Sequence, residues 1–208
     1  MKQLEFRPVG HGGKRPGAGR PKKRPSQVPH LSRPRFKNLP VHITLKVRDD
    51  VGDLRTGKRF RQIQRAFFVA CDRLRMRLLQ FSIQGNHIHL VVEAVDKEAL
   101  STAMQGLAIR LAKGVNRASG RHGAVFSERY HAHLLKTPTE VRNAVHYVLY
   151  NRRKHQRGTH PWDVDEFSSA SGEACWYVGD GGEGALVVVE PRTWLGRHSA
   201  AVDVRLRR

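Results

Sequence analysis

Residues 79–94 read LQFSIQGNHIHLVVEA, and this stretch decides the fold. Apolar side chains alternate at Leu79, Phe81 and Ile83, which predicts a strand with one buried face. Gly85-Asn86 is a turn signal, and HIHLVVEA after it predicts a second strand. The stretch therefore predicts two consecutive strands joined by a short turn.

Amphipathic segments flank this pair on both sides. Upstream, VHITLKV (residues 41–47) alternates apolar and polar side chains as a strand does, and a helix is expected between it and residue 79. The apolar stripe expected on that helix is Phe60, Ile63, Phe67, Cys71, Leu74 and Leu78. The stripe expected on a second helix downstream is Leu100, Met104, Leu107, Leu111 and Val115. A fourth strand is expected across residues 124–135.

A last helix is expected from Pro138 to about Arg153. Thr137-Pro138-Thr139-Glu140 is a capping box with proline at the first helical position. The full order β-α-β-β-α-β predicts an α+β, ferredoxin-like fold with an additional C-terminal tyrosine-bearing helix. In that fold two helices cover one face of a four-stranded antiparallel sheet, and the other face is open for a site.

Two polar groups in this frame suggest chemistry. His87 and His89 lie two apart on a strand and so leave the same face, where two imidazoles can grip one cation. His42, on the polar face of the first strand, is expected nearby. On the last helix Tyr147 lies off the apolar stripe, and Asn151 follows one turn later on the same flank. Taken alone, each pattern is more commonly explained otherwise: the histidines as exposed strand residues, and Tyr147 and Asn151 as a tyrosine at the edge of a hydrophobic contact and an asparagine ending the helix.

The charge of the chain favours a polyanionic partner. Its 208 residues carry a net charge of +20, which suits nucleic acid, although membrane surfaces would also satisfy it. Residues 1–38 are expected to be a basic, disordered arm, in which the segment around Gly19-Arg20-Pro21 resembles an AT-hook; a merely solvated tail is the equal alternative. Residues 161–191 are acidic. No apolar run long enough to span a membrane is seen, and a cytoplasmic, nucleoid-associated protein is expected.

Taken in order, four segments resemble one family. GNHIHLVVEA looks like the HUH motif (His, hydrophobic residue, His) of single-tyrosine transposases, and HYVLYN looks like the tyrosine helix that follows it. VHITLKV upstream and VFSERYHAHLL between the two are similar to the REP-associated tyrosine transposase branch. The resemblance suggests a catalytic domain at residues 39–157 and leaves residues 158–208, an acidic insert and basic tail, without a role.

The resemblance implies a role for each matched residue. Tyr147 would be the nucleophile of a metal-dependent single-stranded DNA nuclease and strand transferase, with Tyr150 as the rival. The metal, Mg²⁺ or Mn²⁺, would be held by His87, His89 and Asn151, with His42 and Tyr130 as supports. Expected nucleic-acid contacts are Arg20, Lys22, Lys23, Arg24, Lys46, Arg110, Lys113, Arg117, Arg152 and Arg153.

The substrate implied is single-stranded DNA, folded as palindromic hairpins, acted on by a monomer or dimer. Attack by the tyrosine would give a 5′-phosphotyrosine intermediate and release a 3′-hydroxyl. Two other functions compete with this one. An RNA-binding module would share the fold but needs aromatic side chains on the open sheet face, where histidine, threonine and lysine are expected instead. A domesticated relative could keep the fold as a DNA-binding architectural or regulatory protein without cleavage.

Overall fold

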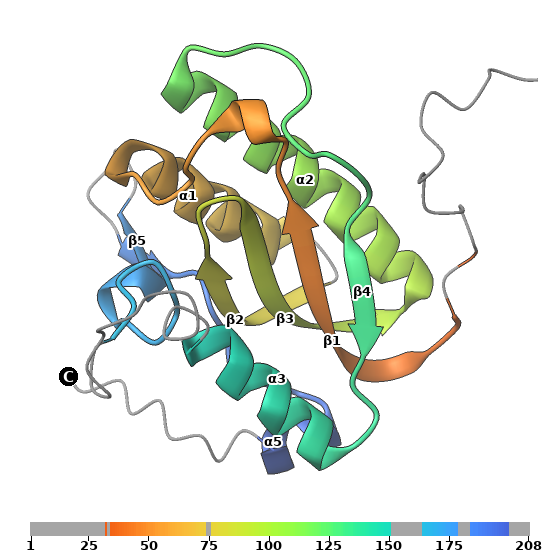
Figure 1. Ribbon diagram of the computed structural model, residues 1–208. Coiled ribbons are helices and arrows are strands. Elements are labelled where there is room, and N and C mark those ends of the chain that lie inside the picture. The colour runs from red at the N-terminus through yellow and green to blue at the C-terminus, as the bar shows by residue number, and fades with distance from the viewer. Residues whose placement is uncertain (1–31, 33, 74–75, 151–163, 179–183, 200–208) are drawn as a thin grey trace, which may run out of the picture. The chain divides into compact units, whose positions relative to one another are not determined.

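Four antiparallel strands form the sheet at the centre of the molecule (Figure 1). The computed structural model describes residues 32, 34–73, 76–150, 164–178 and 184–199. The strands are β1 (Lys37–Lys46), β2 (Met76–Ile83), β3 (His87–Asp96) and β4 (His131–Leu134). Their order across the sheet is β2-β3-β1-β4, which is the ferredoxin-like order that the sequence predicts.

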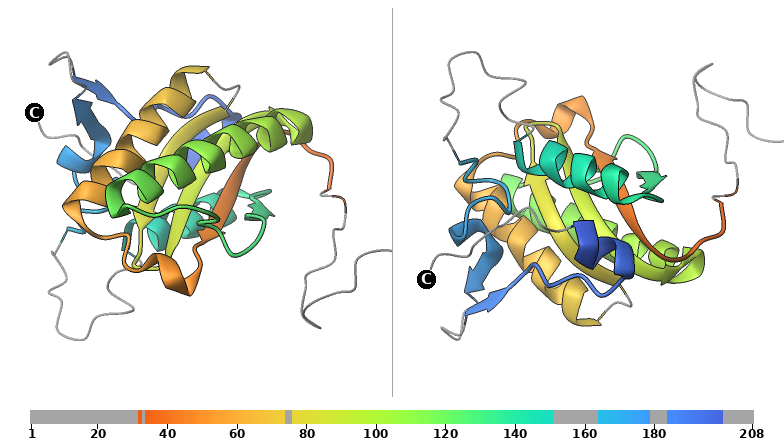
Figure 2. Two further views of the ribbon diagram at one scale, coloured as in Figure 1. Left: turned by 90° about the horizontal axis from the view of Figure 1, so that it is seen from above. Right: turned by 90° about the horizontal axis from the view of Figure 1, so that it is seen from below.

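The two faces of the sheet are covered by different helices (Figure 2). Helices α1 (Gly57–Arg73) and α2 (Lys97–Ser119) pack side by side on one face, over the main apolar core. Helix α3 (Pro138–Tyr150) packs on the other face together with α5 (Trp194–Ser199). The predicted α+β fold with an additional tyrosine-bearing helix is confirmed. None of the helices in the described part of the chain is long and apolar enough to cross a membrane.

All residues of the apolar stripe predicted for α2 are buried. The stripe predicted for α1 extends beyond the end of that helix. Leu78, assigned to the first helix, lies in β2 and points into the main core. The β2–β3 register shifts between Leu78 and Gln80, so Leu79 turns to the opposite face and packs under α3. An irregularity of this kind leaves no trace in apolar periodicity. The side chain of Cys71 and all of Leu74 lie outside the described residues.

Strand β4 is shorter than the sequence predicts. Pairing with β1 covers only His131–Leu134, and a single isolated bridge joins Phe126 to Val47. Between them the backbone leaves the ladder after Ser127, whose nitrogen donates to the oxygen of Lys46 at 3.0 Å. The fourth strand thus exists, but only over the last third of the expected range.

Helix α3 covers part of the sheet face opposite α1 and α2 and leaves the rest of that face open. Its first turn has the predicted capping box, in which Glu140 N donates to Thr137 Oγ1 (3.2 Å) and the Glu140 carboxylate accepts from Lys136 N (2.7 Å). The buried side of the helix packs on the sheet with α5. The residues of this second apolar cluster are Leu79, Val91, Leu135, Val141, Val145, Val148 and Leu149, with Leu195 against it.

The C-terminal segment covers the β2 edge of the sheet. Backbone bonds join Ile83 N to Phe167 O, Ser169 N to Phe81 O and Val189 N to Leu78 O, each at 2.9 Å. Between these contacts lie the 3-10 turn Glu173–Cys175 and the small hairpin of β5 (Trp176–Val178) and β6 (Gly184–Leu186). Because an uncovered edge strand invites pairing with other chains, this segment protects the sheet.

Buried Glu93 ties the end of the described chain to β3. Only 3% of it is exposed, and its carboxylate accepts from Arg192 N (2.8 Å), Thr193 N (3.0 Å) and the Thr193 hydroxyl (2.5 Å). The PRTWLG segment before and within α5 is thereby fixed to the sheet. A buried carboxylate with this many donors fits a structural role.

Replacing Glu93 by alanine should release this anchor. Three donors would lose their acceptor, and we expect the free energy of unfolding to fall by about 1–3 kcal/mol. Chemical denaturation of Glu93→Ala measures this loss, and Glu98→Ala, an exposed carboxylate on α2, is the matched control. Equal stability of the two variants would contradict a structural role for Glu93.

Candidate active site

The side chains that leave the sheet toward α3 come from alternating positions of the two central strands. On β3 these are His87 and His89, and on β1 they are His42 and Thr44. The register pairs Thr44 with His89 across the two strands. The period of two along each strand therefore gathers these polar groups on one face, while Ile88 and Leu90 enter the main core.

Tyr147 of α3 contacts this group. Its ring centroid lies 5.2 Å from that of His89 and 5.8 Å from that of His42, both in edge-on geometry. Tyr150, three residues later, makes its ring contact with His146 at 4.7 Å. The structure thus places the ring of Tyr147 against histidines of β1 and β3.

Hydrogen bonds orient the two β3 histidines. His87 Nδ1 lies 2.7 Å from Asn86 Oδ1, and because a carboxamide oxygen only accepts, the ring hydrogen sits on Nδ1 and the lone pair on Nε2. His89 Nδ1 lies 3.2 Å from both Thr44 Oγ1 and His42 Nε2. Strand β1 thus engages the Nδ1 edge of His89. Ligating histidines in proteins are typically oriented through their second nitrogen in this way.

The histidine pair is suited to part of a metal site. The ring centroids of His87 and His89 are 4.6 Å apart and their planes are nearly perpendicular, at 85°. Among the described residues, no group of three or more His, Cys, Asp or Glu could hold a metal ion. A third ligand drawn from the described residues would therefore have to be of another type. The expected one, Asn151, immediately follows α3 and lies outside the described residues.

His42 is held in its neutral form. Burial, together with the neighbouring imidazoles of His133 and His131, lowers the pKa of His42 from 6.5 to about 4. His133 is its partner in the β1–β4 register. At neutral pH His42 can therefore accept a hydrogen bond or a proton at one ring nitrogen.

The same pKa makes stability depend on pH. Between about pH 6.5 and about pH 4 the unfolded chain binds a proton at His42 that the folded protein does not, so the free energy of unfolding should fall as the pH falls through this window. His42→Gln should flatten that slope, while His122→Gln, at an exposed loop position, should retain it. Denaturation curves in chelator at several pH values test this, and identical slopes for wild type and His42→Gln would refute it.

An open hollow of about 560 Å³ adjoins Tyr147 between β4 and α3. It is lined by His42, His133, Leu135, Glu140, Asn143, Ala144, His146 and Tyr147. Tyr147, the neutral imidazole of His42 and the hollow thus form one continuous surface. His133 was not among the residues singled out from the sequence, although its alternation with His131 in YHAHLL was a usable signal.

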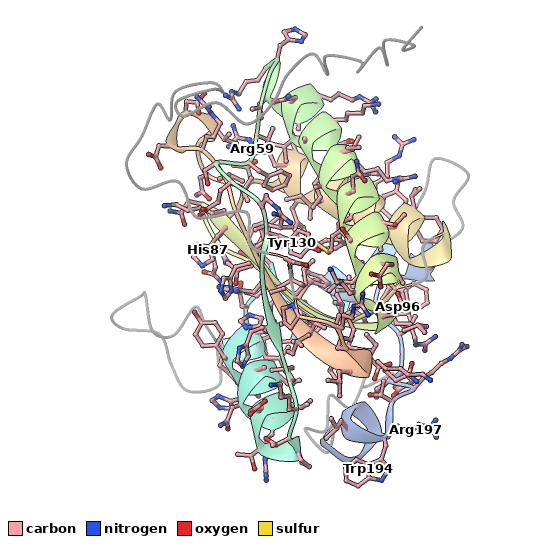
Figure 3. All side chains as sticks on the ribbon, turned by 90° about the vertical axis from the view of Figure 1, so that its right-hand side faces the viewer. Arg59, His87, Asp96, Tyr130, Trp194 and Arg197 are labelled. Carbon is pink, nitrogen blue, oxygen red and sulfur yellow. The ribbon has the colours of Figure 1, made fainter. Side chains whose placement is uncertain are left out.

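The remaining expected site residues are more scattered. Lys46 is exposed on β1, opposite His87 in the register, so it lies at the rim of the site. Tyr130 packs against the main core instead, and Figure 3 shows it on the α2 side of the sheet, away from His87. The structure therefore does not bring Tyr130 to the site. The physical reason is strand alternation, since Tyr130 has the opposite parity to His131 and His133.

Apart from Lys46, the expected DNA-binding basic residues fall into two groups. Arg110, Lys113 and Arg117 lie on α2, in the layer opposite α3, so they cannot belong to the same surface as Tyr147. The rest lie outside the described residues: Arg20, Lys22, Lys23, Arg24, Arg152 and Arg153.

Comparison with known proteins supplies two findings. The family model "Transposase IS200 like" matches residues 36–151. Among solved structures, one of "the REP associates tyrosine transposase bound to a REP hairpin" superposes with a TM-score of 0.54 at 16% identity, over 68% of this chain and 82% of that one. No curated protein sequence matches the chain.

Proposed function

This chain belongs to the IS200-like transposase family, and on that premise we propose that it cuts and rejoins single-stranded DNA through Tyr147. The observation that carries the proposal is the ring contact of Tyr147 with His89 and His42. Of the tyrosines in the described residues, it is the one in contact with the strand histidines. Its position on a packed helix favours a fixed geometry for the phenol, which nucleophilic catalysis requires.

The reaction we propose is a reversible exchange of phosphodiester bonds. The phenol oxygen of Tyr147 attacks the phosphorus, the bond to the 3′ oxygen breaks, and the products are a 5′-phosphotyrosine and a 3′-hydroxyl. The phenol, with a usual pKa near 10, must lose its proton as the bond to phosphorus forms, and the departing 3′ oxygen must gain one to give the hydroxyl. A second 3′-hydroxyl reverses the step and joins a new strand.

We propose His87, His89 and Asn151 as the ligands of a divalent ion. Two imidazoles and one carboxamide suit a mixed nitrogen and oxygen site, for which Mg²⁺ or Mn²⁺ is the proposed occupant. When bound, such an ion neutralises charge that develops on the phosphate oxygens. The contacts of Asn86 and Thr44 with the Nδ1 edges support ligation through Nε2.

The proposed substrate is a DNA hairpin with an unpaired flank. The surplus of basic residues, +20 overall, favours a polyanion. The similar solved protein is bound to a REP hairpin, which motivates the same substrate class here. The proposal includes the basic arm, residues 1–38, as an additional duplex contact, a monomer or dimer as the acting form, and the nucleoid of the cytoplasm as its place of action.

A labelled hairpin substrate tests the proposal. Wild-type protein with Mn²⁺ or Mg²⁺ should cut palindromic single strands and remain covalently attached to the 5′-phosphate of the fragment on the 3′ side of the cut, visible as a slow band on a denaturing gel. Chelator should abolish the band. Hairpin binding without any cut, over a panel of palindromes and both metals, would favour the domesticated binding protein instead.

A further inference from the structure

The hollow beside Tyr147 has a chemistry that selects its occupant. One end is formed by His42 and Tyr147, and the other by Glu140 and Asn143 of the first turns of α3. Its volume of about 560 Å³ is in the range of pockets that hold small molecules. Because it is continuous with the nucleophile, whatever fills it lies next to the reacting phosphate.

Glu140 argues against a phosphate in the hollow itself. It brings the one carboxylate among the lining residues, and like charges repel. Its role in the helix cap uses one acceptor site, on Oε2, whereas a carboxylate offers about four. An occupant that donates hydrogen bonds is therefore favoured at this end.

The other lining groups complete a surface for a planar base. Leu135 and Ala144 supply apolar wall, and the imidazoles of His133 and His146 supply faces on which a ring can stack. The Asn143 carboxamide both donates and accepts, which is the pattern that asparagine uses on adenine, and carboxylates accept from the amino group of cytosine.

We propose that this hollow binds one unpaired nucleobase bearing an exocyclic amino group, in the nucleotide next to the phosphate that Tyr147 attacks. The inference rests on the proposed function and adds to it a determinant of sequence specificity. Adenine, cytosine and guanine each bring an amino group to Glu140 and Asn143. Thymine lacks one and should be the poorest occupant.

The substitution Glu140→Gln isolates this role from the helix cap. Glutamine keeps an oxygen for Lys136 N and is itself a capping-box residue, so α3 should form as before. The loss of the carboxylate should reduce the preference for amino bases over thymine, about tenfold in wild type, to within about twofold. Asn143→Ala, at an exposed helix position, should narrow the preference likewise. Glu98→Gln on α2 is the control and should retain it.

The readout is competition binding, measured by fluorescence anisotropy, with hairpins that carry each of the four bases in turn at every unpaired position of the flank. Thermal unfolding verifies that each variant is folded. A base preference that is confined to one position of the flank, and is lost in both Glu140→Gln and Asn143→Ala, supports the inference. A wild type without base preference, or variants that keep it, overturns the inference even if cleavage proceeds. If the base preference is present but no substrate is cut, base binding in the hollow is supported and the proposed cleavage is contradicted.

Discussion

Tyr147→Phe should abolish the covalent protein–DNA adduct and reduce strand cleavage by about a thousandfold or more. The substitution removes one oxygen and keeps the ring, so the contacts with His42 and His89 and the packing of α3 should survive. Hairpin affinity should therefore stay within about twofold of wild type, because the phenol contributes little to binding a polyanion. Gel analysis of a hairpin labelled at its 3′ end, in the fragment that stays joined to the protein, measures the adduct, and a binding titration measures the affinity.

Tyr150→Phe is the matched control on the same helix. Its ring contacts His146 of the same helix, and it is not the proposed nucleophile, so cleavage should remain close to the wild-type rate. The reverse result, with adduct formed by Tyr147→Phe and lost in Tyr150→Phe, would show that the nucleophile was assigned to the wrong tyrosine.

His87→Ala should cost about a hundredfold or more in metal-dependent cleavage. Removing one of the proposed ligands weakens the binding of the ion that offsets phosphate charge, an effect of several kcal/mol. His87 is only partly buried, so the fold should tolerate the change better than it would at His89, which is 4% exposed. Isothermal titration with Mn²⁺ and cleavage rates as a function of Mn²⁺ concentration test binding and activity separately.

Asn86→Ala tests the same proposed metal site with a smaller expected effect. It leaves His87 in place but removes the oxygen that holds the ring hydrogen on Nδ1, so Mn²⁺ affinity should fall about 10–100-fold. High Mn²⁺ should restore the cleavage rate of Asn86→Ala more fully than that of His87→Ala. Unchanged Mn²⁺ affinity in both variants would exclude His87 as a ligand.

Structural features that depend on the local spacing of apolar and polar residues could be predicted from the sequence. Three such features are the strand pair around Gly85-Asn86, the buried stripe of α2 and the start of α3 at Pro138. Each depends on a spacing pattern or a helix cap that spans only neighbouring residues. The common face of His87 and His89 follows from strand alternation alone. Histidine and threonine, without Phe, Tyr or Trp, extend from this face of β1 and β3 within the site, whereas an RNA-binding sheet of the RRM type is expected to present such rings there.

What the sequence could not predict depends on contacts between distant segments. The β2 edge is covered by residues about 85 to 110 positions later in the chain, such as Ser169 against Phe81 and Val189 against Leu78. Neither this pairing nor the Glu93 anchor of Thr193 has a local pattern. The separation of Arg110 from Tyr147, by contrast, follows from the predicted ferredoxin-like fold, in which α2 covers the sheet face opposite the site. The role of Asn151 stays a prediction.

The central claim is that Tyr147 becomes covalently joined to DNA. The most direct measurement is mass spectrometry of the peptide that carries the nucleotide after wild-type protein has reacted with a hairpin and both partners have been digested. We predict a fragment spectrum in which the added nucleotide 5′-phosphate is localised to Tyr147. Localisation to Tyr150 or to any other residue, or complete cleavage with no modified peptide, would contradict the account.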